Sequence, residues 1–295
     1  METTPDLEKI HRILVVGAGA MGSQIGLVGA LAEYQITVQD ISEGMLVSAR
    51  EDLSRRLDRN VAKGRLDRGE ADAVLDRMSF TTSLRDAAST ADFVIEAAVE
   101  RLDIKREIFR ELDRYAPAHA VLATNSSTLG SSRVADATGR PDRVCNMHFF
   151  NPALVMKCVE VVRHESTSQQ TVDTTMALAR RMGKAPILIN REIPGFVANR
   201  LLGAVRTEAL RLYDGGIASF EDIDTAAKTA LGHPMGPFEL MDLVGLDVAY
   251  LIRQAHYQET GDPDDLPHPA LTELYEAGHY GRKTGKGWYE YPKGS

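Results

Sequence analysis

The chain has 295 residues, of which 43% are hydrophobic and 26% charged, which is the composition of an ordinary folded protein. Acidic residues outnumber basic ones by 42 to 34, and the net charge of −8 disfavours general binding to nucleic acid or to anionic membrane surfaces. No stretch reaches the roughly 18 apolar residues of a membrane span, and the charged N-terminal segment lacks the apolar core of a signal peptide. With only Cys145 and Cys158, and no metal-type spacing, we expect a cytoplasmic protein with neither a disulfide framework nor a bound metal.

Short apolar runs alternate with amphipathic stretches over the first two thirds of the chain, a pattern typical of α/β domains. These runs predict strands at residues 13–16, 36–39, 93–97, 121–123, 143–147, 159–162 and 186–189. Most are short apolar runs, which are typical of strands covered by helices on both faces, so we expect a mostly parallel sheet. Apolar residues also recur at helical spacing through residues 42–78 with a break at Lys63 and Gly64, which predicts an added helical hairpin.

The pattern changes after residue 189. A segment with proline and glycine at residues 190–195 is followed by helical patterns over residues 196–213, 220–231, 237–259 and 268–276, with no convincing strand. We therefore expect two domains, residues 1–192 and residues 193–295, of which the second is all-helical.

The first predicted strand runs into a GxGxxG turn at the head of a helical pattern. The first glycine permits the tight turn, the second lets a pyrophosphate approach the backbone, and the third lets helix and strand pack closely. Asp40 ends the second strand about 20 residues further on, where a carboxylate accepts hydrogen bonds from a ribose and repels a 2′-phosphate. The alternative is a plain glycine turn with an exposed aspartate. The order of elements favours a Rossmann-type domain that binds NAD rather than NADP, through Gly17, Gly19, Ala20, Met21, Gly22 and Asp40.

The chemistry of a dehydrogenase requires a base near the substrate hydroxyl, and histidine is the usual choice. His148 follows the predicted strand at residues 143–147, and the carboxyl ends of strands are where open α/β sheets bind ligands. Glu160 lies inside an apolar run, where an unpaired carboxylate is costly, so we predict that it pairs with His148 and stabilises the imidazolium. Taken alone, His148 is also explained as a structural histidine, and Glu160 is also explained as an acid on an edge strand.

Polar residues follow the predicted strand at residues 121–123. We expect Asn125 and Ser127 in this segment to bind the nicotinamide ribose or a substrate oxygen, although a helix-capping turn has the same composition. Asn199 lies in an apolar helical run, where it either presents its amide to the active site or faces solvent.

Together these segments resemble the 3-hydroxyacyl-CoA dehydrogenase family, most closely its bacterial single-function 3-hydroxybutyryl-CoA dehydrogenases. The resemblance extends over nearly the whole chain and is carried by VVGAGAMGSQIG, ADFVIEAAVERLDIKREIF, TNSSTL, NMHFFNPALVMKCVEVV, PGFVANRLL, GHPMGPFELMDLVGLD and GRKTGKGWYEY. It implies that His148 and Glu160 are catalytic and that Ser127 and Asn199 bind substrate. It also places Glu100 and Lys105 near the nicotinamide side of the cofactor.

The resemblance further implies reversible, NAD-dependent oxidation of an L-3-hydroxyacyl-CoA by a homodimer that associates through its helical domains, with the substrate between the two domains. Two departures affect the expected contacts: TNSST replaces the commoner SNTSS, and Arg101 stands where the family usually has asparagine. One alternative is a dehydrogenase of the same fold that acts on a free or carrier-protein-bound 3-hydroxy acid. Another is a non-catalytic NAD-binding redox sensor, against which the presence of both His148 and Glu160 argues.

Overall fold

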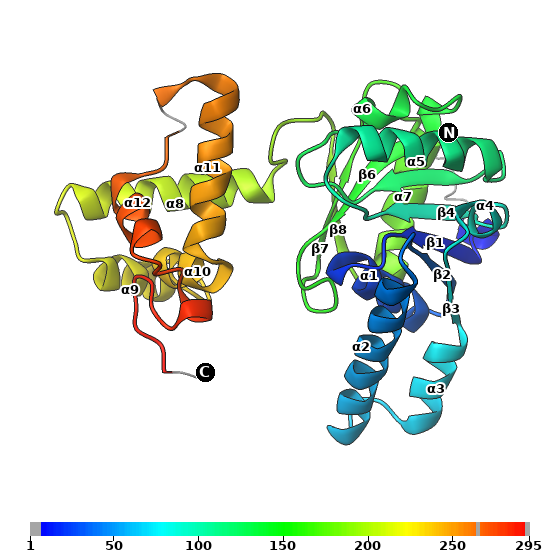
Figure 1. Ribbon diagram of the computed structural model, residues 1–295, viewed down its shortest axis with the longest axis horizontal. Helices are drawn as coiled ribbons and strands as arrows, with labels where there is room; N and C mark the ends of the chain where they lie inside the picture. Colours follow the sequence, from blue (N-terminus) through cyan, green and yellow to red (C-terminus); the bar gives the residue numbers. More distant parts are fainter. Residues whose placement is uncertain (1–6, 264–265, 293–295) are drawn as a thin grey trace. The chain divides into compact units, whose positions relative to one another are not determined.

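The computed structural model describes residues 7–263 and 266–292. The chain divides into two compact units (Figure 1): residues 1–197, here called the sheet unit, and residues 198–295, here called the helical unit. Within the described ranges, no helix is both long and apolar enough to cross a membrane.

The sheet unit is built on eight strands in the order β3-β2-β1-β4-β5-β6-β7-β8. Their bounds are β1 Arg12–Val16, β2 Gln35–Gln39, β3 Met78–Thr81, β4 Phe93–Glu96, β5 Val121–Thr124, β6 Val144–Phe149, β7 Cys158–Val162 and β8 Ala185–Ile189. Every neighbouring pair is parallel except β6 and β7, so the predicted mostly parallel sheet is confirmed. The prediction missed β3, a four-residue edge strand whose sequence MSFT mixes polar with apolar residues.

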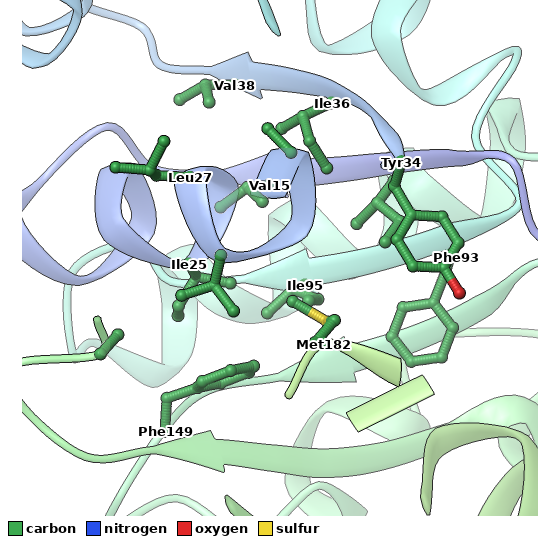
Figure 2. Close-up of a cluster of buried hydrophobic side chains, with 14 of the residues drawn as sticks. Val15, Ile25, Leu27, Tyr34, Ile36, Val38, Phe93, Ile95, Phe149 and Met182 are labelled. Atoms are coloured by element: carbon green, nitrogen blue, oxygen red, sulfur yellow. The ribbon is translucent and has the colours of Figure 1, made fainter. Parts of the chain in front are cut away.

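Helices cover both faces of this sheet. The helices are α1 Ala20–Leu31, α2 Glu43–Ala62, α3 Arg68–Asp76, α4 Leu84–Ala88, α5 Leu102–Tyr115, α6 Ser132–Ala135 and α7 Gln169–Arg181, with short 3-10 helices at Leu7–Lys9 and Pro141–Arg143. Successive residues of a strand point to opposite faces of the sheet. In β1, Ile13 and Val15 pack in a core with α1, α2, α3 and α7, whereas Leu14 and Val16 pack in a core with α4, α5 and α6. Figure 2 shows the first of these cores. Burial on both faces explains why β1, β4, β5 and β7 consist mostly of apolar residues.

The helical hairpin predicted within residues 42–78 is formed by α2 and α3, which extend side by side from the sheet unit (Figure 1). The Ser42 hydroxyl accepts the Met45 N–H at the start of α2. Asp67 and Glu70 form a capping box at the start of α3, in which each side chain accepts a hydrogen bond from the backbone N–H of the other residue. Gly64, with φ of +65°, makes the turn between them.

The helical unit contains α8 Ala198–Asp214, α9 Phe220–Ala230, α10 Pro237–Val244, α11 Leu246–Thr260, α12 Pro269–Glu276 and the 3-10 helix η4 Arg282–Thr284. The predicted helical character of this part is confirmed, but two predicted helix bounds are wrong. A single helix over residues 237–259 is interrupted at Gly245, whose φ of +109° leaves the helical region. The helix expected from residue 196 begins two residues later, because Phe196 has a φ of +47°.

A buried carboxylate ties the C-terminal segment to the helical unit. Asp242 on α10 is 1% exposed and accepts the backbone N–H groups of Trp288 and Tyr289, each at 2.9 Å, and the Tyr291 hydroxyl at 3.0 Å. Trp288 packs edge to face on Phe238 of α10, with 4.6 Å between ring centroids. The glycine-rich segment before Trp288 thus ends in a fixed contact with the helices.

Candidate active site

The turn between β1 and α1 has the geometry of a phosphate cradle. Gly17 has a φ of +104°, and a Cβ there would lie 2.6 Å from the Ala97 carbonyl oxygen. A Cβ on Gly22 would lie 1.9 Å from the Gly17 carbonyl oxygen, so helix and turn pack too closely for any side chain. Gly19 is the N-cap residue of α1, and no side chain there accepts a hydrogen bond from the first N–H groups of the helix. A Cβ on Gly19 would have open space around it. The free N–H groups of this helix end therefore suit an anion.

Asp40 fixes the same turn from the end of β2. Its carboxylate accepts the Ala18 N–H at 2.8 Å and the Ser42 N–H at 2.9 Å. The three residues that follow Asp40, which are Ile41, Ser42 and Glu43, include no basic side chain that could pair with its carboxylate or with a phosphate. The open glycine turn and a half-buried carboxylate at the adjoining strand end fit a dinucleotide with an unphosphorylated ribose. Met21, on the first turn of α1, packs against the neighbouring core.

The two residues predicted to form the catalytic pair are hydrogen-bonded to each other. His148 Nδ1 lies 2.8 Å from Glu160 Oε2, with side chains 6% and 0% exposed. They meet because β6 and β7 form the one antiparallel pair of the described sheet, in which His148 and Glu160 stand opposite each other. The sequence predicted a strand that ends at residue 147, just before His148, but β6 continues to Phe149 and includes His148. Glu160 lies on β7 between β6 and β8, so the alternative of an edge-strand acid is wrong.

The pair has a defined chemistry. A buried carboxylate is stabilised when it accepts a hydrogen bond, which favours the tautomer that directs Nδ1–H to Glu160 and leaves the lone pair on Nε2. Among the described residues, no protein group hydrogen-bonds to Nε2. The rings of Phe150 and Phe196 lie 4.6 and 5.7 Å from the His148 ring, centroid to centroid, and limit its movement. An imidazole held in this way can act as a general base, and a carboxylate at Nδ1 stabilises its protonated form.

The segment that follows β5 lies beside this pair. Asn125 accepts the Phe149 N–H at 2.8 Å, which joins the end of β5 to the residue after His148. Asn146 on β6 donates to the carbonyls of Ser126 and Leu129, each at 3.2 Å, and so holds the loop that carries Ser127. Ser127 itself is half-buried, and its hydroxyl makes no hydrogen bond within the described residues. The hydroxyl is therefore available to a ligand.

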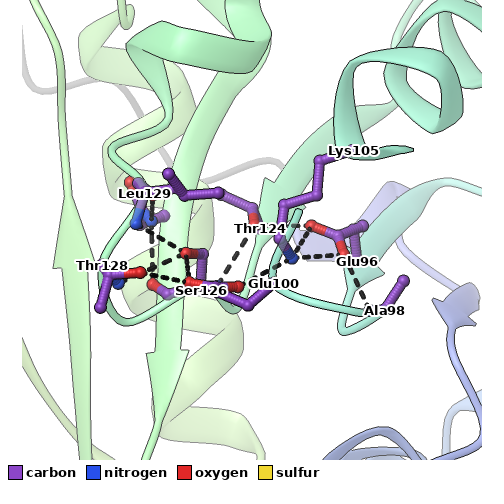
Figure 3. A network of polar contacts seen from close by, with 9 residues as sticks. Glu96, Ala98, Glu100, Lys105, Thr124, Ser126, Thr128 and Leu129 are labelled. Carbon is purple, nitrogen blue, oxygen red and sulfur yellow. Dashed lines mark hydrogen bonds and ion pairs between the residues drawn. The ribbon is translucent and has the colours of Figure 1, made fainter. Parts of the chain in front are cut away.

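Glu100 and Lys105 belong to a network of polar contacts, which Figure 3 shows. The Lys105 ammonium is 1% exposed and lies 2.7 Å from Glu96 Oε1 and 3.2 Å from Glu100 Oε2. Glu96 also accepts the Thr124 hydroxyl at 2.7 Å and the Ala98 N–H at 2.8 Å. The network therefore connects β4, β5 and α5 beside the nucleotide turn.

The two unusual positions of the TNSST segment are also joined to this network. The hydroxyls of Ser126 and Thr128 both donate to Glu100. Burial raises the pKa of Glu100, but these hydrogen bonds and the Lys105 ammonium outweigh it, and the net pKa lies below its usual value. Arg101, the second departure, points to Asp103 instead, at 2.5 Å on an exposed surface.

Asn199 lies in the first turn of α8, in the helical unit, with an exposed side chain. Sequence reasoning missed Glu96 and Asn146, both fully buried. The signal that singled out Glu160, an acid within an apolar run, was present for Glu96 in FVIE as well.

A sheet with a glycine-rich nucleotide turn and a buried histidine–carboxylate pair defines a nucleotide-dependent dehydrogenase. Residues 12–193 match the family described as 3-hydroxyacyl-CoA dehydrogenase, NAD binding domain, and residues 195–291 match 3-hydroxyacyl-CoA dehydrogenase, C-terminal domain. The chain therefore belongs to the 3-hydroxyacyl-CoA dehydrogenase family. It is an NAD-dependent oxidoreductase, as the resemblance implied.

Individual proteins show how similar the chain is to its relatives. It is 40% identical to a probable 3-hydroxybutyryl-CoA dehydrogenase of Bacillus subtilis, over 96% of this chain and 98% of that one. The crystal structure of (S)-3-hydroxybutyryl-CoA dehydrogenase from Ralstonia eutropha is 36% identical, with a TM-score of 0.87 over 97% of this chain and 100% of that one. A structure of a diketoreductase that acts on dicarbonyl compounds is 33% identical, with a TM-score of 0.86 over 98% of this chain and 100% of that one.

Proposed function

We propose that the protein oxidises a short-chain L-3-hydroxyacyl-CoA, such as 3-hydroxybutyryl-CoA, reversibly to the 3-oxoacyl-CoA. The observation that carries this proposal is the buried 2.8 Å contact between His148 and Glu160 in a chain whose relatives are named for this substrate class. Bound NAD supplies the hydride acceptor.

His148 would remove the proton of the substrate hydroxyl at Nε2, and return it when the reaction runs in reverse. Glu160 holds the ring by Nδ1, which fixes the tautomer and stabilises the imidazolium that forms. The free hydroxyl of Ser127 and the amide of Asn199 would orient the oxygens of the substrate. Asp40 and the glycine turn would bind the adenosine ribose and the pyrophosphate, with Asn125, Glu100 and Lys105 toward the nicotinamide.

The test is NADH consumption with acetoacetyl-CoA, run beside NADPH and beside free acetoacetate at equal concentrations. Turnover with NADH and the thioester supports the proposal. His148→Gln should then lower kcat by about 10²–10⁴-fold while NAD affinity is retained, because a base contributes to the transition state rather than to cofactor binding. A folded His148→Gln protein with normal turnover would remove the mechanism.

The second candidate is a dehydrogenase of a 3-hydroxy acid that is free or bound to a carrier protein. The similarity to the diketoreductase supports this second candidate, because the name of that relative refers to dicarbonyl compounds. Faster turnover of free acetoacetate than of acetoacetyl-CoA in the same assay would establish this second function in place of the first.

The proposal includes a homodimer formed through the helical unit. On α8, Leu201 is 64% exposed and Val205 lies one turn further along the same face. On α11, Leu251 and Ile252 are 52% and 49% exposed, and Val248 lies one turn before them. Apolar rows of this kind are uncommon on a solvated surface, and they support association with a second copy of the chain.

A further inference from the structure

The residues between β8 and α8 make three contacts with the site described above. This linker, residues 190–197, contains Glu192, Phe196 and Val197 and leads directly into α8. None of the three was identified from the sequence as a functional residue. All three contacts lie within the sheet unit.

The first contact anchors the linker to the loop that carries Ser127. Glu192 Oε1 accepts the Ser131 hydroxyl and the Ser132 N–H, each at 2.9 Å, and Oε2 accepts the Ser132 hydroxyl. The Ser131 N–H in turn donates to Asn146 on β6 at 2.7 Å. The carboxylate fits closely, because a Cβ on Gly130 would lie 2.6 Å from Glu192 Oε2. The linker and the end of the Ser127 loop are therefore joined by a single side chain.

The second and third contacts reach the catalytic pair. The Val197 N–H donates at 3.0 Å to Glu160 Oε1, the carboxylate oxygen that His148 does not contact. The Phe196 ring is 2% exposed, packs against Val162 and Ile189, and lies 5.7 Å from the His148 ring. Phe196 holds this place with a φ of +47°, a conformation that a bulky residue adopts only when its surroundings impose it.

We propose that Glu192 is a positioning residue for the catalytic pair: it anchors the linker so that the Val197 amide and the Phe196 ring hold Glu160 and His148 in place. The inference rests on the proposed function of that pair. Glu160 needs its second oxygen fixed if the carboxylate is to face Nδ1 in one orientation, and the linker provides that contact. Because a small misplacement of reacting groups lowers rates strongly, loss of the anchor should lower kcat rather than cofactor affinity.

The experiment compares Glu192→Ala, Glu192→Gln and Gly130→Ala in the full chain. Glu192→Ala removes every acceptor, whereas Glu192→Gln keeps one acceptor oxygen and an amide that can donate to a serine hydroxyl. Gly130→Ala displaces the carboxylate without changing it, and serves if Glu192→Ala does not fold. Asp113→Asn is the matched control, since Asp113 also anchors a loop, through Gly139 and Arg140, but has no contact with the linker.

Two readouts are measured on each variant: kcat with acetoacetyl-CoA and NADH, and hydrogen exchange at the Val197 amide. We expect Glu192→Ala and Gly130→Ala to lower kcat about tenfold and to speed Val197 exchange about tenfold, with NAD affinity unchanged. Glu192→Gln should lie nearer the wild type, and Asp113→Asn should match it.

Unchanged exchange at Val197, or unchanged kcat, in both Glu192→Ala and Gly130→Ala would overturn the inference. If the wild type itself shows no turnover with acetoacetyl-CoA, the proposed function fails, and the exchange measurement alone then decides whether Glu192 anchors the linker.

Discussion

The carboxylate of Asp40 and the backbone of Ala18 are joined by a 2.8 Å hydrogen bond between the end of β2 and the nucleotide turn. One side chain therefore has two tasks. It fixes the conformation of the turn through Ala18, and in the proposed cofactor site its negative charge would distinguish a ribose from a ribose phosphate.

Asp40→Ala should weaken NAD binding about tenfold or more, because hydrogen bonds to a charged group contribute about 1.5–3 kcal/mol each. NADP binding should fall less, since the repulsion of its phosphate is removed at the same time, and so the ratio of the two dissociation constants should narrow. Fluorescence titration with NAD and with NADP measures the two dissociation constants. Asp67→Ala, which removes a helix cap on α3, is the control. An unchanged ratio would show that Asp40 does not select the cofactor.

Lys105→Met should destabilise the sheet unit by about 3–5 kcal/mol, because it leaves Glu96 buried without its cation. The double variant Glu96→Gln with Lys105→Met should recover part of this loss, since the uncompensated charge is gone. Urea unfolding of the two variants and the wild type gives the comparison. Arg110→Ala breaks the exposed pair with Glu107 and should cost no more than about 1 kcal/mol. Equal losses for Lys105→Met and Arg110→Ala would contradict the burial argument.

Glu100 should contribute to the pH dependence of stability. Its pKa in the folded protein lies below the usual value of 4.5, so the folded state favours the ionised form. This contribution is complete above the unfolded pKa and is lost as the pH falls through the lower folded pKa. Glu100→Gln should therefore flatten the decline of the unfolding free energy from about pH 6 to pH 3. The exposed Glu107→Gln is the comparison, and an identical decline in both variants would argue against the effect.

The sequence predicted those parts of the fold and site that depend on local pattern. The strands β1 and β4 were found because they are covered on both faces and, apart from Arg12 and Glu96, contain only apolar residues. His148 and Glu160 were proposed as a pair because a carboxylate inside an apolar run needs a partner. Their register, which places them opposite each other on antiparallel strands, depends on the order of the strands and not on either segment alone.

Other features depend on contacts between distant segments, so no local pattern predicted them. Phe196 continues an apolar helical pattern, yet it adopts a positive φ because its ring packs against β7 and β8. Gly245 interrupts a helical pattern that is apolar on both sides of it. The anchoring role of Glu192 requires residues about 60 positions earlier in the chain, a separation that sequence periodicity does not report.

Asp242→Ala should destabilise the helical unit by about 3 kcal/mol or more, because Trp288, Tyr289 and Tyr291 each lose an acceptor. Burial, and then the hydrogen bond to Asp242, raise the pKa of Tyr291 to about 12. The same variant should therefore lower the pKa of the Tyr291 phenol, which an alkaline absorbance titration against Tyr291→Phe identifies. Calorimetry measures the stability. A variant with unchanged thermal unfolding would show that the C-terminal segment is not held by this carboxylate.

Leu251→Glu should convert the proposed dimer to a monomer. The substitution places a charge in the middle of the exposed apolar row of α11, where burial against a second copy would leave it unpaired. Light scattering coupled to size-exclusion chromatography gives the mass. Leu231→Glu is the matched control, because Leu231 is 70% exposed at the end of α9, outside the rows on α8 and α11. If the wild type elutes as a monomer, or if both variants keep the same dimeric mass, these rows are not the dimer interface.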